Sequence, residues 1–202
     1  MRRRRSAIGS IVELVLIVVV ALLLALAIQA FIVKPYRIPS GSMEPTLTIG
    51  QRVLVDRIGN DFSTPHVGEI VVFHPPKDAE SEVCGAVHLS TAACDRPEGE
   101  DSSENFIKRI VAGPGDVISI VDGHVIRNGK REKDGYILPC TADEAAMCNF
   151  PTPIKIPPGM WFMMGDNRGA SDDSRFWGPV PTSWIIGDAF ATYWPPDRIG
   201  FL

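Results

Sequence analysis

Residues 8–33 form an almost continuous apolar run, which constrains the fold more than any other feature of the sequence. The run is 26 residues long and is interrupted mainly by Gly9, Ser10, Glu13 and Gln29. As an α-helix it would measure about 39 Å at 1.5 Å per residue, which is enough to cross a bilayer with some tilt. The sequence therefore predicts one transmembrane helix over residues 8–33, after a short basic segment at residues 1–7.

Four arginines, Arg2 to Arg5, immediately precede the apolar run. Positive residues beside a span favour the cytoplasmic side, so we expect a single-pass plasma-membrane protein with residues 34–202 outside the cytoplasm. A cleavable secretory signal is the alternative, because the basic start, the apolar stretch and Ala25-Leu26-Ala27 imitate its three regions. The anchor is favoured because apolar sequence resumes at Ala30 and the stretch is long for a signal peptide.

The chain after Val33 contains 16 basic and 23 acidic residues, so its net charge of −7 argues against a nucleic-acid surface. Short β-branched runs between prolines and glycines predict strands, and Asp122-Gly123 and Asn128-Gly129 predict tight hairpin turns. The sequence thus predicts a mainly antiparallel β domain. Its strands are expected at residues 52–56, 69–73, 106–111, 116–121, 124–127, 153–156, 160–164 and 185–194.

Residues 78–105 form an acidic insert, which is expected to be a solvated loop. The four cysteines allow three disulfide connectivities, and sequence proximity favours Cys84–Cys94 with Cys140–Cys148 in an oxidising compartment. A metal site is the competing interpretation, but neither pair has close zinc-ligand spacing and His88 is the only nearby imidazole. We expect structural disulfides and no metal.

The segment Ile38-Pro-Ser-Gly-Ser-Met-Glu-Pro-Thr-Leu47 packs small, turn-forming residues between apolar ones and predicts a sharp turn that exposes a hydroxyl. Such serines usually bond to local backbone groups, so the segment alone is weak evidence for catalysis. A nucleophilic serine needs a base, most often histidine. All four histidines are expected at the surface: His66, His74, His88 and His124.

A lysine can replace histidine as the base where burial favours its neutral form. Two-residue periodicity in the run Phe106–Val111 places Lys108 on one face with Phe106 and Ile110, whereas Arg109 points to the other face. Lys108 is therefore the candidate base. The other lysines of the domain that we weighed are expected to face solvent: Lys77, Lys130, Lys133 and Lys155.

The third segment, Met164 to Gly178, is rich in turn formers and opposite charges. It predicts a loop tied by carboxylate–arginine bonds among its four central charged residues, Asp166, Arg168, Asp173 and Arg175. A lysine base also needs a group that orients its amine. Ser171 and Ser174 are the candidates.

These three segments, in this order behind one N-terminal anchor, resemble bacterial type I signal peptidase, also called leader peptidase. The resemblance covers most of the chain beyond the anchor and includes residues 38–47, 68–73, 107–116 and 165–181. It implies a serine endopeptidase without metal or organic cofactor, in which Ser42 is the nucleophile and Lys108 the general base. The Ser40 hydroxyl and the Ser42 amide would form the oxyanion site.

The resemblance further implies that Ser171 orients the lysine and that Asp173 and Arg175 form a supporting salt bridge. It implies cleavage of exported preproteins after small side chains at the first and third positions before the cut, beside the lipid bilayer and near the secretion translocon. The sequence departs from the common family pattern at Glu69, Gly169 and Ala170. The residues expected to line the substrate pockets are Ile38, Met43, Leu47, Phe106 and Ile107.

Two other functions are compatible with parts of this pattern. A self-cleaving Ser/Lys regulator would need an internal cleavage site and usually a DNA-binding part, but no helix-turn-helix precedes Ser42. An inactive membrane-anchored β binding module would keep its function after Ser42→Ala. Neither alternative accounts for all three segments.

Overall fold

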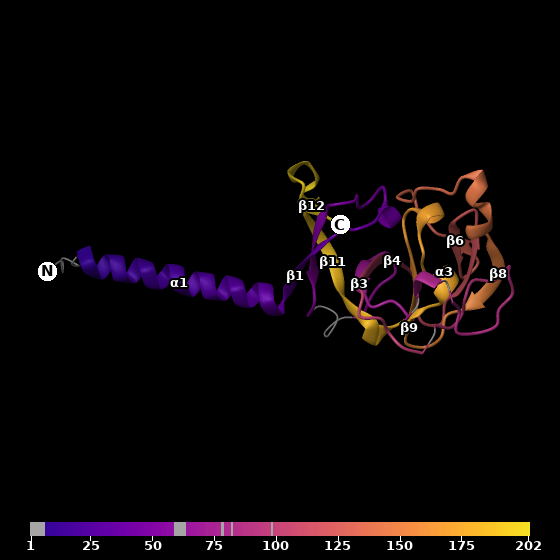
Figure 1. Ribbon diagram of the computed structural model, residues 1–202, viewed down its shortest axis with the longest axis horizontal. Helices are drawn as coiled ribbons and strands as arrows, with labels where there is room; N and C mark the ends of the chain where they lie inside the picture. The colour runs from indigo at the N-terminus through magenta and orange to yellow at the C-terminus, as the bar shows by residue number, and fades with distance from the viewer. Residues whose placement is uncertain (1–6, 59–63, 78, 82, 98) are drawn as a thin grey trace.

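A single long helix extends from one side of a β domain (Figure 1). The computed structural model describes residues 7–58, 64–77, 79–81, 83–97 and 99–202. Helix α1 (Ala7–Phe31) contains Gly9–Leu26, whose residues are all exposed and which is long and apolar enough to cross a membrane. The helix is therefore compatible with a single-pass membrane anchor.

The helix ends two residues before the apolar run does. The Ile32 carbonyl accepts a hydrogen bond of 2.9 Å from the Arg57 amide, and strand β1 (Val33–Arg37) begins at the next residue. Pro35 cannot donate a helical hydrogen bond, which also favours the extended backbone. The chain thus passes from the helix directly into the sheet.

The main sheet has eight strands, all in antiparallel pairs. Seven follow the order β1-β2-β11-β3-β4-β9-β10, and β12 pairs with β11. Their bounds are β2 (Arg52–Asp56), β3 (Ile70–Phe73), β4 (Phe106–Ala112), β9 (Met160–Met164), β10 (Val180–Pro181), β11 (Ile185–Trp194) and β12 (Gly200–Phe201).

A second antiparallel sheet contains β7 (Lys130–Arg131), β6 (His124–Arg127), β5 (Val117–Val121) and β8 (Phe150–Lys155), in that order. Asp122 and Asn128 have positive φ angles of 51° and 54°, and the glycine after each is also positive. Two successive positive φ values are typical of type I′ hairpins. The two hairpin turns predicted by Asp-Gly and Asn-Gly are therefore confirmed.

The mainly antiparallel β architecture is confirmed, and each predicted strand overlaps an observed one. Four of the observed strands were not predicted: β1, β7, β10 and β12. Strand β1 contains Pro35 between charged residues and lies at a sheet edge, where the alternation of apolar and polar residues is weak. Strands β7, β10 and β12 have two residues each, which is too short for a periodic pattern.

Short helical turns connect the strands and complete the domain. They are η1 (Gly41–Met43), η2 (Ala79–Ser81), η3 (Ala142–Met147), η4 (Arg168–Ala170), α3 (Ser174–Trp177), η5 (Thr182–Trp184) and η6 (Pro196–Arg198). Of these, η1, η4 and α3 carry the residues of the candidate site.

Both expected disulfides form, with Cα–Cα separations of 5.7 Å for Cys84–Cys94 and 6.5 Å for Cys140–Cys148. The acidic insert differs from the solvated loop that its charge predicted. Ala92 to Cys94 are buried, and the Cys94 amide donates a 2.9 Å hydrogen bond to the Arg175 carbonyl. The remainder of the insert that the structure describes is largely exposed. The insert is thus fastened to the domain at its centre.

Candidate active site

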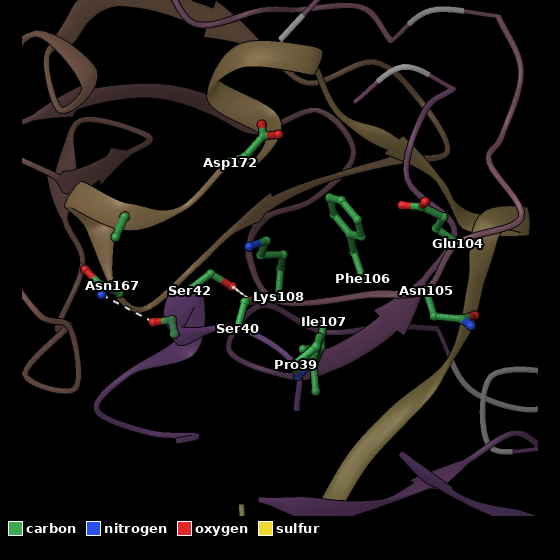
Figure 2. Close-up of a pocket in the computed structure, with 12 residues that line it drawn as sticks. Pro39, Ser40, Ser42, Glu104, Asn105, Phe106, Ile107, Lys108, Asn167 and Asp172 are labelled. Atoms are coloured by element: carbon green, nitrogen blue, oxygen red, sulfur yellow. Dashed lines mark hydrogen bonds between the residues drawn. The ribbon is translucent and has the colours of Figure 1, made fainter. Parts of the chain in front are cut away.

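The three segments singled out in the sequence converge on one cleft of about 660 Å³ (Figure 2). One wall comes from the chain around η1, one from β4 and the residues before it, and one from the turn after β9. The lining residues are Pro39, Ser40, Gly41, Ser42, Glu104, Asn105, Phe106, Ile107, Lys108, Asn167, Ala170 and Asp172.

Ser42 lies on the single turn of η1 and is 9% exposed. Its carbonyl accepts a 3.0 Å hydrogen bond from the Asn167 amide, while the Asn167 side chain donates to the Gly41 carbonyl at 3.2 Å. The Ser40 hydroxyl oxygen is 3.4 Å from that of Ser42. Asn167 therefore holds the serine turn against the third segment, a role that the sequence did not reveal.

Lys108 is 4% exposed, and Ile110 on the same face of β4 is fully buried. Its amine lies 5.9 Å from the centre of the Phe106 ring, and Lys108 lines the same cleft as Ser42 (Figure 2). Burial lowers the pKa of Lys108 to about 8, although Asp173 and Asp172 oppose this shift. The neutral amine is thus accessible at mildly alkaline pH.

The Ser171 hydroxyl is buried and has no hydrogen-bond partner among the residues that the structure describes. It lies next to Gly165, where a Cβ atom would overlap both the Ser171 hydroxyl and the Ser42 carbonyl oxygen. Glycine at this position lets the serine turn and the Ser171 loop approach closely. Ser171 does not line the cleft itself, but an unpaired buried hydroxyl is a candidate partner for a buried lysine amine.

Asp173 and Arg175 form an ion pair in which both side chains are fully buried. Arg175 Nε and Nη2 donate to the two carboxylate oxygens at 2.7 and 2.9 Å, and Nη2 also donates to the Ser171 carbonyl at 2.9 Å. Burial favours a raised pKa for Asp173, but Arg175 and then Lys108 lower it below its usual value. The Asp173 carboxyl therefore stays ionised, and Arg175 fixes the backbone of Ser171.

A second ion pair, between Arg109 and Asp166, was not anticipated from the sequence. Asp166 is fully buried and accepts hydrogen bonds from Arg109 at 2.9 and 2.7 Å and from the Thr46 hydroxyl at 2.6 Å. Arg109 follows Lys108, Thr46 follows the serine turn, and Asp166 follows β9. This cluster fastens together the three walls of the cleft.

Arg168 differs from the prediction that carboxylate–arginine pairs tie this loop. Its guanidinium donates to the Gly165 carbonyl at 3.0 Å and to the Gly123 carbonyl, so backbone oxygens take the place of a carboxylate. A Cβ at Gly169 would meet the Glu144 carboxylate, which is the end of a flexible side chain and can shift.

The expected pocket residues are divided between the cleft and the core. Phe106 and Ile107 line the cleft, and Ile38 joins them in an adjacent hollow of about 210 Å³. Met43 and Leu47 are fully buried and pack in the hydrophobic core with Val53, so they do not line the cleft. Met43 thus packs in the core while Ser42, its neighbour on the same turn, lines the cleft.

The remaining candidates lie outside the cleft. Ser174 is fully buried, and its hydroxyl accepts a 3.0 Å hydrogen bond from the Met163 amide, whereas the Ser171 hydroxyl has no partner among the described residues. None of the four histidines lines the cleft, and His124 Nδ1 lies 2.8 Å from the Asp134 carboxylate. Within the described residues, no three metal-ligating side chains are grouped to hold an ion.

Comparison with known proteins gives a consistent result. The family model described as signal peptidase, peptidase S26, matches residues 11–194. Probable signal peptidase I-1 from Synechocystis sp. is 38% identical over 92% of this chain and 84% of its own length. Signal peptidase I from Leptolyngbya laminosa is 34% identical over 90% of this chain and 79% of its own length.

A crystal structure of a signal peptidase I from Enterococcus faecalis is also similar, with a TM-score of 0.38 and 21% identity over 62% of this chain and 97% of that one. The family model matches nearly the whole chain, including the serine turn, β4 and the loop after β9. The chain therefore belongs to the signal peptidase family, peptidase S26.

Proposed function

We propose that this protein is a membrane-anchored serine endopeptidase that removes N-terminal signal peptides from exported preproteins, with Ser42 as nucleophile and Lys108 as general base. The observation that carries the proposal is a buried lysine with a lowered pKa that lines the same cleft of about 660 Å³ as Ser42. Membership of the signal peptidase family supports the same substrate class.

In the proposed reaction, the neutral Lys108 amine accepts the Ser42 hydroxyl proton as Oγ attacks the scissile carbonyl carbon. The ammonium then returns the proton to the leaving amine, and water hydrolyses the acyl-enzyme with Lys108 again as base. The Ser40 hydroxyl, 3.4 Å from Ser42 Oγ, and the Ser42 amide would donate to the oxyanion. Ser171, fixed through Arg175, would orient the amine.

The substrate would bind as an extended strand along the first half of β4. Arg109 pairs with Met164 on β9, whereas Ile110 bonds to Gly68 and Glu69 on the opposite side. Backbone groups alternate sides along an antiparallel strand, so those of Ile107 point to the edge beyond the end of β9. A peptide can add there, with its alternate side chains against Phe106 and Ile38.

We further propose that the N-terminus is cytoplasmic and that residues 34–202 form an extracytoplasmic domain at the plasma membrane. The arginines that precede α1 support this orientation, although they lie outside the described residues. Strand β1 follows the helix directly, and the serine turn follows β1. The cleft therefore remains near the bilayer surface, where a translocated signal peptide emerges beside the translocon.

The test of this function is cleavage of a preprotein with alanine at the first and third positions before the cut. Phenylalanine at the first position is expected to slow cleavage about 10–100-fold, which corresponds to 1–3 kcal/mol of overpacking in the pocket. Phenylalanine at the second position is the matched control, because its side chain points away from the pockets. Equal rates for the three preproteins would contradict pocket recognition.

A further inference from the structure

Glu104, Phe106 and Lys108 form a row along one side of the cleft (Figure 2). They occupy alternate positions, and the Phe106 ring lies between the amine and the carboxylate. Glu104 lies two residues before the start of β4 at Phe106. It also lines a hollow of about 210 Å³ next to the cleft. The end of the cleft beyond Phe106 therefore carries a negative charge.

The backbone of Glu104 is fixed, while its carboxylate is available. The Glu104 amide donates to the Ser102 hydroxyl at 3.1 Å, and its carbonyl lies 2.9 Å from His74 Nδ1. The exposed carboxylate has no hydrogen bond or ion pair within the part of the chain that the structure describes. The cation of the adjacent hollow, Lys77, is already paired with Glu100 at 3.3 Å.

We propose that Glu104 is a specificity-determining residue that favours substrates with a lysine or arginine near the fifth position before the cut. The inference rests on the proposed function, in which the residue before the cut lies at Lys108 and the substrate runs along β4. Four residues separate Lys108 from Glu104, or about 13 Å at 3.3 Å per residue. An extended substrate that runs parallel to β4 covers that distance with its fifth residue.

A basic side chain also suits the surface that leads to Glu104. The aliphatic stem of lysine or arginine would lie on the Phe106 ring while its charged end reaches the carboxylate. The ion pair would be partly solvated, so its effect should be modest and should decrease with salt. Peptides that carry lysine and glutamate at the fifth position are expected to differ about fivefold in kcat/KM at low ionic strength.

The effect of Glu104 is separable from the chemistry of Lys108. The charges that shift the pKa of Lys108 are those of Asp173, Asp172, Arg175 and Asp166. A Glu104 variant should therefore change the preference between peptides without moving the midpoint of the pH–rate profile. A shifted midpoint would mean that the substitution had disturbed the dyad instead.

The test uses the full-length protein in detergent and three peptides with lysine, alanine or glutamate at the fifth position and alanine at the first and third. The ratio of kcat/KM for the lysine peptide to that for the glutamate peptide is compared within each enzyme. We expect a ratio of about five for the wild type and below one for Glu104→Lys. Asp95→Lys, an exposed insert residue outside the cleft lining, makes the same charge change and should keep the wild-type ratio.

A wild-type ratio of one, an unchanged ratio in Glu104→Lys, or an equal loss in Asp95→Lys would overturn the inference. These outcomes leave the proposed function standing, provided that the alanine peptide is cleaved by the wild type and not by Ser42→Ala. If no peptide is cleaved, or if Ser42→Ala cleaves as well as the wild type, the proposed function is wrong. The inferred preference for a basic residue at the fifth position is then wrong as well.

Discussion

Replacing Lys108 by alanine or by arginine is expected to reduce peptide cleavage by at least about 1,000-fold, a loss typical of removing a member of a catalytic constellation. Alanine removes the base that accepts the Ser42 proton. Arginine keeps a positive charge at the site but stays protonated at any working pH. Activity in Lys108→Arg above about a tenth of the wild type would show that the charge of Lys108 matters and not its basicity.

The loss should not arise from unfolding. Burying the Lys108 amine costs free energy, because the charged form loses its hydration and forms no hydrogen bond among the described residues. Alanine removes this desolvation penalty as well as some packing, so the two effects on stability oppose each other. Far-UV circular dichroism and the thermal midpoint check this. Lys155→Ala, an exposed lysine on β8, is the matched control and should leave the cleavage rate unchanged.

Arg175→Ala should produce the largest loss of stability among single substitutions near the site. It leaves the Asp173 carboxylate fully buried without its ion-pair partner, which typically costs about 3–5 kcal/mol. It also releases the Met147 carbonyl, which accepts a 2.7 Å hydrogen bond from Arg175 Nη1. For a domain of this size, the thermal midpoint is expected to fall by roughly 6–20 °C.

Differential scanning calorimetry measures this fall, with Arg131→Ala as the control because Arg131 is exposed on β7. The control should change the stability by no more than about 0.5 kcal/mol. A double variant, Asp173→Leu with Arg175→Met, removes both charges and should recover part of the loss. If Arg175→Ala lowers the thermal midpoint no further than Arg131→Ala does, the buried ion pair does not contribute to the stability of the domain.

Local sequence patterns were sufficient to predict most of the strands and the position of Lys108 in the site. The β-branched runs correspond to strands because each has a periodic apolar face, and two-residue periodicity placed Lys108 with the buried Ile110. Periodicity did not choose between Ser40 and Ser42 or connect either of them to Lys108. That connection came from the resemblance to a family, because the residues are separated by more than 60 positions.

Other parts of the site depend on contacts that leave no local signal. Asp166 receives hydrogen bonds from residues 57 and 120 positions away, so its role emerges only when three segments fold together. Met43 and Leu47 are apolar residues beside the nucleophile, a composition that suits a pocket as well as a core. The structure assigns them to the core because the turn of η1 presents Ser42 to the cleft and Met43 to the sheet.

The dependence of kcat/KM on pH tests the central claim most directly, namely that the neutral amine of Lys108 activates Ser42. The pKa of Lys108 is lowered to about 8, mainly by burial. Below that pH the amine is protonated and cannot accept the serine proton, so kcat/KM for a peptide without titratable side chains should rise through about pH 8 and then level off. A flat profile from acid to alkaline pH would contradict the assignment of Lys108 as the base.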